Sequence, residues 1–286
     1  MSARPVLKGI TVVEAASGLA GPMAGCRLAD LGANVVKVEW DDGDWMRQCP
    51  PFLKDRTSAD FFALNRGKRG VLLGAEPKQR AALLRRLVET ADVFITDQDS
   101  DGLAALGLEG ADAETCAWNP RLIVAQISAL GREGPLADMP GSELGAQAMA
   151  GYTRYVGTLG KQSIRLGADV AGASTAIFTT QAVLAALFSR RRTGRGQRVD
   201  LSLLNSLVAM KTVHLAAQSD PDSFEGPRVA ALMIRRSAAG RRPTRRSRSR
   251  SVVRWAPKGG PAGPNSSRRS ACRGCSKIRA STRPAA

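Results

Sequence analysis

Hydrophobic residues along this chain fall in short apolar runs that alternate with segments of helical periodicity. The apolar runs predict buried strands at residues 10–14, 34–39, 69–73, 92–96 and 122–127. Helical spacing predicts helices at residues 22–31, 78–91, 143–155 and 170–193, and residues 199–202 lead into a last helix that ends at residue 215. Strands and helices that alternate at these lengths indicate an α/β fold built on a parallel sheet.

The first strand and the first helix are joined by a glycine-rich turn, a place where α/β proteins often bind nucleotides. Its glycines stand at positions 18, 21 and 25, so they lack the G-x-G-x-x-G spacing of a dinucleotide site. Glu39 ends the second strand, where such a site keeps its ribose-binding acid. The acid without the glycine spacing is weak evidence, and we do not expect a nicotinamide cofactor.

Charge is distributed very unevenly along the 286 residues. Residues 1–228 carry 26 Lys+Arg and 25 Asp+Glu, whereas residues 229–286 carry 16 basic residues and no acidic residue. The net charge of +17 therefore describes a near-neutral body with a basic tail. We predict a folded α/β body over residues 5–228 and a disordered low-complexity tail over residues 229–286, which would bind nucleic acid only non-specifically, through phosphates.

Cysteine usage and hydropathy favour a cytoplasmic protein without a metal site. Cys272 and Cys275 form a single C-x-x-C with no histidine near it, and the other cysteines are scattered. The start of the chain runs directly into a strand pattern without a signal peptide. Residues 170–188 carry no charge and are long enough to cross a bilayer, but serine, threonine and glutamine interrupt them and arginines at 190–192 follow. A buried core helix fits this stretch better than a membrane span.

Asp169 stands immediately before this uncharged stretch. A carboxylate at the start of a helix is favoured by the unpaired backbone N–H groups and by the helix dipole, so Asp169 fits an N-cap. It equally fits a carboxylate nucleophile held near a pocket, beside the small residues Gly167, Ala168, Ala171 and Gly172. The residues alone leave both roles open.

Four sequence blocks stand in a characteristic order over residues 7–228. They are Gly9-Ile10-Thr11-Val12-Val13-Glu14 with Leu19-Ala20-Gly21-Pro22 and residues 28–39; Phe62-Ala63-Leu64-Asn65-Arg66-Gly67-Lys68-Arg69; Asn119-Pro120-Arg121 leading to Gly134-Pro135; and Gly167-Ala168-Asp169 with residues 193–202. Each block alone is weakly specific. Together they closely resemble the family III CoA-transferases, the CaiB/BaiF proteins, which include formyl-CoA and carnitine CoA-transferases.

The resemblance implies a Rossmann-like parallel sheet and an enzyme that moves CoA from an acyl-CoA to a carboxylic acid. In this family an aspartate at the position of Asp169 attacks the thioester and then carries CoA as an aspartyl thioester, so Asp169 is the expected catalytic residue. Ala20 and Leu73 match positions that line the nucleotide end of CoA. The resemblance also implies that CoA is a substrate rather than a permanently bound cofactor, and that the complete protein is an interlocked homodimer.

Several positions depart from the family pattern. Trp40 stands where a basic residue often follows the acid of the second strand, and Ala105 stands where an arginine is often found. These departures leave the details of CoA anchoring open. Lys68 and Arg69 fit a solvated strand entry as well as they fit a CoA contact.

CoA-ester racemases of the same family are an alternative. They pair the aspartate with a histidine, which would fall near Ser142 in this chain. The only histidine, His214, lies in a late helix among apolar residues and fits a core position. Racemase chemistry is therefore the less favoured reading.

The basic tail invites a hypothesis of a different class, in which the chain is a non-catalytic fragment whose tail binds nucleic acid. A shifted reading frame explains the tail better. Reading GC-rich codons for residues 233–261 one base out of register yields a string with acids, aromatics and a glycine-rich loop, as expected of a continuing CoA-transferase. We expect a chain that ends in such a tail to transfer little CoA, and neither donor nor acceptor acid can be read from the sequence.

Overall fold

The computed structural model describes residues 5–40, 42–74, 76–111, 116–153 and 163–212. The chain divides into two units, Met1–Gly240 and Arg241–Ala286, and every described residue belongs to the first. The predicted basic tail, its two cysteines and His214 lie outside the described residues.

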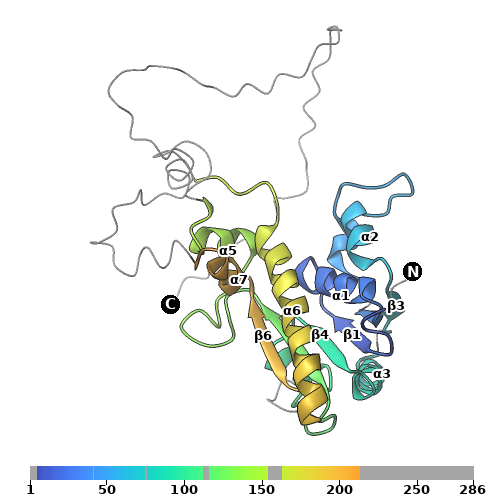
Figure 1. Cartoon of the computed structure of the whole chain (residues 1–286). Coiled ribbons are helices and arrows are strands. Elements are labelled where there is room, and N and C mark those ends of the chain that lie inside the picture. The colour runs from blue at the N-terminus through green and yellow to red at the C-terminus, as the bar shows by residue number, and fades with distance from the viewer. Residues whose placement is uncertain (1–4, 41, 75, 112–115, 154–162, 213–286) are drawn as a thin grey trace, which may run out of the picture. The chain divides into compact units, whose positions relative to one another are not determined.

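A six-stranded parallel sheet forms the centre of the described unit (Figure 1). Its strands are β1 (Thr11–Ala15), β2 (Asn34–Glu39), β3 (Arg69–Leu72), β4 (Val93–Thr96), β5 (Ile123–Ser128) and β6 (Arg198–Ser202). They lie in the order β3-β2-β1-β4-β5-β6, and each neighbouring pair is parallel. In this doubly wound order the winding reverses between β1 and β4, which opens a crevice outside the carboxyl ends of the strands. The predicted parallel α/β fold is confirmed.

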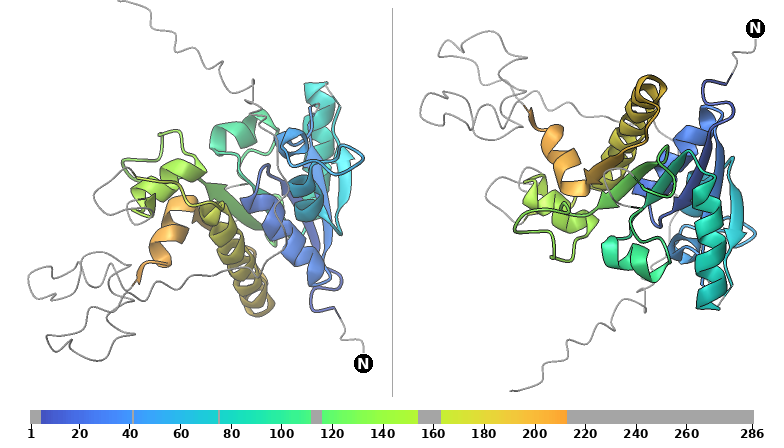
Figure 2. Two further views of the ribbon diagram at one scale, coloured as in Figure 1. Left: turned by 90° about the horizontal axis from the view of Figure 1, so that it is seen from above. Right: turned by 90° about the horizontal axis from the view of Figure 1, so that it is seen from below.

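Helices cover both faces of the sheet (Figure 2). They are α1 (Ala20–Asp30), the 3-10 helix η1 (Trp45–Gln48), α2 (Ala59–Asn65), α3 (Pro77–Glu89), α4 (Ser100–Ala105), α5 (Glu143–Met149), α6 (Val170–Thr193) and α7 (Leu203–Ala209). Because side chains of a strand alternate between faces, Val12 and Ile95 pack with α1 and α6, whereas Val13 and Phe94 pack with α3 and α4. Both faces are mainly apolar, as is usual for a buried parallel sheet, although Glu14 of β1 and Lys37 of β2 are also buried.

Helix α6 crosses one face of the sheet beside α1 (Figure 1). Its hydroxyl groups are satisfied within the helix, since Thr175 and Thr179 each donate to the carbonyl four residues earlier, at 2.8 and 2.7 Å. Among the described helices only α6 is long and apolar enough to span a membrane, but 56% of its most apolar window is buried in the protein. This burial agrees with the predicted core helix.

The far end of α6 is tied to the sheet by a buried arginine. Arg190 donates to Asp92 Oδ1 and to the carbonyl of Arg121, both at 2.8 Å, at the amino ends of β4 and β5. The helix then stops at Gly194, which adopts φ 73°, a conformation that favours glycine. The predicted end of this helix at residue 193 is confirmed.

The structure differs from the local expectations in some places. Residues 199–202 do lead into a last helix, α7, which begins at Leu203, but they form most of edge strand β6, which was not predicted. The helix predicted over residues 143–155 ends at Met149, since Gly151 has φ 73° and turns the chain. Helices η1, α2 and α4 were not predicted, because each is too short to show periodicity.

Candidate active site

Asp169 occupies the N-cap position of α6, but its side chain does not cap the helix. Its backbone has φ −83° and ψ 68°, and its carboxylate accepts no hydrogen bond from the first turn. It pairs instead with the guanidinium of Arg165. Both side chains are partly exposed, 41% for Asp169 and 46% for Arg165, so solvent reaches the carboxylate and screens the pair. The carboxylate is therefore available to a bound molecule.

The capping function is supplied by Glu143, the first residue of α5. Its Oε1 accepts from the N–H of Ala171 and its Oε2 accepts from the N–H of Gly172, both at 2.8 Å. These are the N–H groups that an N-cap side chain would ordinarily bind. A negative charge here also interacts favourably with the positive end of the helix dipole. Glu143 thus satisfies the first turn of α6, so the carboxylate of Asp169 is not drawn into capping the helix.

Gln147, one turn further along α5, holds both Glu143 and the segment before Asp169. Its amide nitrogen donates to Glu143 Oε1 at 2.7 Å and to the carbonyl of Ala168 at 3.2 Å, and its amide oxygen accepts from the N–H of Leu166 at 3.1 Å. The side chain is fully buried. A buried amide with its hydrogen bonds made fixes the groups around it, so Gln147 sets the path of residues 166–168 into the helix.

The small residues near Asp169 serve two purposes. A side chain on Gly172 would meet Leu19 at 2.9 Å, and Ala171 is fully buried, so both are small to allow packing. Gly167 and Ala168 are exposed, and nothing lies within 4 Å of where a Cβ on Gly167 would stand. Only Gly167 and Ala168 leave open space beside the carboxylate.

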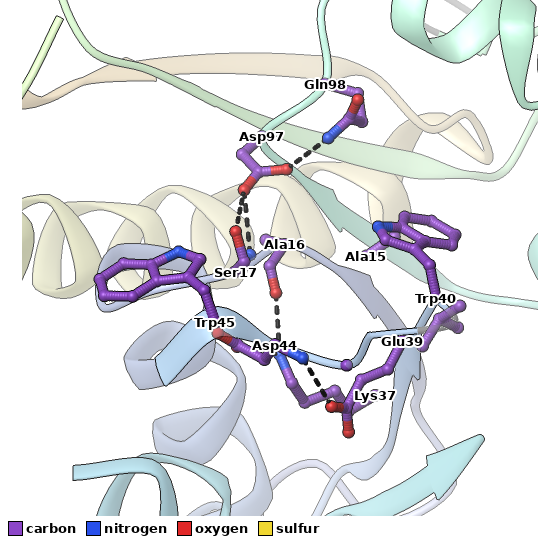
Figure 3. Close-up of a pocket in the computed structure, with 12 residues that line it drawn as sticks. Ala15, Ala16, Ser17, Lys37, Glu39, Trp40, Asp44, Trp45, Asp97 and Gln98 are labelled. Carbon is purple, nitrogen blue, oxygen red and sulfur yellow. Dashed lines mark hydrogen bonds and ion pairs between the residues drawn. The ribbon is translucent and has the colours of Figure 1, made fainter. Parts of the chain in front are cut away.

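A second feature lies at the carboxyl ends of β1, β2 and β4, where the order of the strands reverses. Residues after these strands line a crevice of about 190 Å³. In Figure 3 the indoles of Trp40 and Trp45 stand on opposite sides of it, with Ser17 and Asp97 between them. The turn that holds Ser17 continues to Leu19, which touches α6 at Gly172, so it runs from the crevice toward the start of α6.

Acidic groups dominate the lining of this crevice. Asp97 Oδ2 accepts from the N–H of Ser17 at 2.9 Å, and Asp44 Oδ1 accepts from the N–H of Gly18 at 3.2 Å. Glu39 accepts from Arg47 Nε and Nη2, both at 2.7 Å, and from the N–H of Asp44. Burial acts to raise the pKa of Glu39, but the hydrogen bonds from Arg47 and from the Asp44 backbone outweigh it, and the pKa is lowered.

Lys37 is the only basic side chain among the residues that line the crevice. Its ammonium lies 3.2 Å from Glu14 Oε1, 2.9 Å from Asp44 Oδ2 and 2.8 Å from the carbonyl of Ala16. Burial acts against its charged form, but Glu14 and Asp44 outweigh burial and raise the pKa of Lys37. Its three donors are thus engaged by protein acceptors.

The prediction that Lys68 could be a solvated residue was wrong. Its side chain is 2% exposed and pairs with Glu14 Oε2 at 2.7 Å, and it also donates to Asn65 Oδ1 and the carbonyl of Pro22 at 2.8 Å. Burial lowers the pKa of Lys68, and Glu14 opposes that effect.

Gly25 of α1 must lack a side chain, because a Cβ there would collide with Glu14 Oε2. Lys68 belongs to a buried ion cluster, whereas Arg69 is exposed.

Comparison with known proteins agrees with this arrangement. The sequence model described as CoA-transferase family III matches residues 7–234, well over half of the chain. The chain belongs to CoA-transferase family III. It is 40% identical over 209 residues to a succinate–glutarate CoA-transferase of Agrobacterium fabrum, covering 71% of this chain and 52% of the relative. It is 32% identical over 212 residues to a formyl-CoA:oxalate CoA-transferase of Streptomyces avermitilis, covering 74% and 51%.

Solved structures give the same family. The crystal structure of a CaiB/BaiF family protein from Brucella suis superposes with a TM-score of 0.70 at 34% identity, covering 78% of this chain and 59% of that one. The chain spans about half the length of the curated relatives that it matches. The fold predicted from the family resemblance is therefore confirmed for the part that is matched.

The two residues expected at the nucleotide end of a CoA-transferase site lie next to the crevice and not in its lining. Ala20 begins α1, whose N-cap Leu19 offers no side-chain acceptor to the first turn. Leu73 is 1% exposed and packs in the core with Val13 and Val38, and its N–H donates to the carbonyl of Glu39 at 2.9 Å. Leu73 therefore presents almost no surface to a ligand.

Ser142 stands where a racemase of this family would place a histidine. Its hydroxyl accepts from the N–H of Gly145 at 3.0 Å and so caps α5. Ser142 therefore positions Glu143 through the start of the helix. Glu143 and Gln147 were not predicted as site residues, and the Ser142-Glu143 helix start was the signal that could have drawn attention to them.

Proposed function

We propose that this protein transfers CoA from an acyl-CoA to a carboxylic acid, with Asp169 as the nucleophile. The observation that carries the proposal is the uncapped carboxylate of Asp169 at the head of α6, where Glu143 has taken over the backbone N–H groups. A carboxylate that bound those groups would have its lone pairs occupied. One that does not can attack a carbonyl.

The reaction divides into balanced steps. The Asp169 carboxylate attacks the thioester carbonyl, and the carbon–sulfur bond breaks. The CoA thiolate departs, and a mixed anhydride of Asp169 and the donor acid is formed. The thiolate attacks the aspartyl carbonyl and displaces the donor acid as its carboxylate, which forms an aspartyl-CoA thioester. The acceptor carboxylate repeats the sequence in reverse and regenerates Asp169. No net proton transfer is needed, since free carboxylic acids are ionised at neutral pH.

The geometry supports a substrate that reaches from the crevice to Asp169. The crevice lies at the topological switch point, where parallel α/β sheets bind nucleotides. The turn over residues 17–20 leads from the crevice to α6, and the open space at Gly167 lies beside the nucleophile. The nucleotide end would occupy the crevice, with Ala20 and the backbone of Leu73 nearby, and the thioester would lie at Asp169.

Racemase chemistry is the weaker alternative. It requires a second group to exchange the proton next to the thioester carbonyl. The hydroxyl of Ser142 is engaged in capping α5, and it is a poor base. The acids used by the relatives, succinate, glutarate and oxalate by their names, fit a small carboxylate as the acceptor. We further infer a cytoplasmic homodimer in the complete form.

Trapping of the acyl-enzyme tests the proposal. The 286-residue chain, and in parallel the product of the shifted reading frame, would be incubated with acyl-CoA and hydroxylamine, and the modified peptide identified by mass spectrometry. We expect a hydroxamate at Asp169 and its loss in Asp169→Ala. Asp60→Asn, which changes an exposed carboxylate in the first turn of α2, is the matched control. An undiminished rate of CoA transfer by Asp169→Ala would overturn the assignment.

A further inference from the structure

The crevice at the switch point has a lining that does not suit a phosphate group. Glu39, Asp44 and Asp97 contribute three carboxylates, and Lys37 contributes the single ammonium. That ammonium is engaged by Glu14, Asp44 and the carbonyl of Ala16. A phosphate in this crevice would meet excess negative charge and no uncommitted side-chain cation among the lining residues.

The same crevice suits an uncharged planar ring. Trp40 and Trp45 present indoles from its two sides, and Trp45 is 57% exposed and so accessible to a ligand (Figure 3). Nucleic bases stack on such rings without regard to charge. The volume of about 190 Å³ has room for one bicyclic ring system and little more.

The position of Trp40 gives the crevice its preference for an uncharged ring over a phosphate. Trp40 directly follows Glu39 at the carboxyl end of β2, and the carboxylate of Glu39 already accepts three hydrogen bonds, two from Arg47 and one from the Asp44 backbone. Glu39 is also only 7% exposed, so little of it is open to a ribose hydroxyl, which is the usual partner of an acid at this point of the fold. We therefore expect the nucleotide to be recognised at the end of β2 by the indole of Trp40.

We propose that Trp40 makes this protein indifferent to the 3′-phosphate of CoA, so that thioesters of 3′-dephospho-CoA bind as well as those of CoA. The crevice takes the purine by stacking on an indole, and the 3′-phosphate contributes no affinity. This inference rests on the proposed use of CoA thioesters, and it extends the substrates to a nucleotide end that lacks one phosphate.

Calorimetric titration of the full chain, and in parallel of the product of the shifted reading frame, with CoA and with 3′-dephospho-CoA tests the proposal. We expect dissociation constants within about threefold of one another, because the residues that line the crevice offer no strong phosphate contact, which would be worth tenfold or more. Raising the ionic strength from about 0.01 M to about 0.1 M should not weaken CoA relative to the dephospho form, since screening relieves repulsion. Tenfold tighter binding of CoA, or no saturable binding of either compound, would overturn the inference.

Two variants separate stacking from charge. Trp40→Arg supplies a cation beside Glu39 and should favour CoA over 3′-dephospho-CoA by about tenfold or more. Trp40→Phe keeps an aromatic ring and should leave the two compounds equal. An equal preference in Trp40→Arg would show that the 3′-phosphate lies elsewhere and contradict the proposal. Equal, saturable binding without hydroxylamine trapping at Asp169 would instead refute CoA transfer and leave the crevice assignment standing.

Discussion

Asp169 and Glu143 separate two roles that would conflict in a single residue. One is the capping of α6, and the other is the proposed attack on a thioester. A helix as long as α6 needs an acceptor at its first turn, and a nucleophile needs free lone pairs. Glu143 meets the first need from a neighbouring helix, and Gln147 keeps Glu143 in place. The separation explains how an aspartate can stand at an N-cap position and remain reactive.

Replacing Glu143 should therefore affect Asp169. In Glu143→Gln one side-chain oxygen becomes an NH₂ group, which cannot accept from the Gly172 or Ala171 N–H and repels the donor of Gln147. We expect the Asp169 side chain to turn inward and cap α6, the rate of Asp169 acylation to fall on the order of a hundredfold, and KM to change little. Thermal unfolding should report a loss of about 2 kcal/mol.

The matched control for this prediction is Glu133→Gln, which neutralises an exposed glutamate in the loop after β5. It should retain the acylation rate and the stability of the parent. If Glu143→Gln acylates Asp169 at the parental rate, the division of tasks between the two carboxylates is refuted.

Among the elements, β1, β2 and α1 are joined by the buried ions Glu14, Lys37, Asp44 and Lys68. Each charge has a partner within 3.2 Å, which offsets the cost of removing it from water. Glycine at position 25 lets α1 approach closely enough to cover the cluster. These ion pairs hold together the first strand–helix–strand segment, which contributes part of the lining of the crevice.

Removing one member of this cluster should be costly. Lys68→Met leaves Glu14 buried with one ion partner in place of two, and we expect a loss of about 3 kcal/mol in the free energy of unfolding measured with urea. Arg69→Met, at the next and exposed position, should stay within about 0.5 kcal/mol of the parent. Equal losses of unfolding free energy in the two variants would show that the buried pair of Lys68 and Glu14 does not stabilise the fold more than an exposed side chain does.

Local sequence patterns predicted the elements whose evidence is contained in a few neighbouring residues. Buried strands such as β2 and β5 are short and rich in valine and isoleucine, and the end of α6 is marked by Gly194. The roles of Glu143 and Lys68 depend on partners far along the chain, such as Ala171 for Glu143 and Glu14 for Lys68. No local pattern signals such pairs, so they were missed or misread.

At the scale of the whole molecule, the described unit has apolar surface that further chain would be expected to cover. On α6, Phe188 is 66% exposed and Ile177 is 38% exposed, and a groove of about 440 Å³ runs between α6 and the β6–α7 segment. The chain also spans only about half the length of its curated relatives. Surface of this kind is typical of a site of association.

A shifted reading frame would account for both the basic tail and this surface, and the nucleotide sequence tests this hypothesis. We expect that moving one base downstream of the Leu232 codon opens a continuation in which acidic and aromatic residues return. The product of that frame should be more soluble and should turn over acyl-CoA, whereas the 286-residue chain should aggregate and turn over little. Absence of such a frame, together with brisk transfer by the 286-residue chain, would contradict this view.

Helix α6 is anchored at both ends, by Glu143 beside Asp169 and by Asp92 around Arg190. A helix of 24 residues is about 36 Å long, so these anchors lie on opposite sides of the fold. If Asp169 reacts as proposed, variation at Arg190 is expected to shift the proposed nucleophile from the far end of α6. Ranking variants by their distance from Asp169 would classify such a change as harmless, although it removes one of the two anchors of the helix.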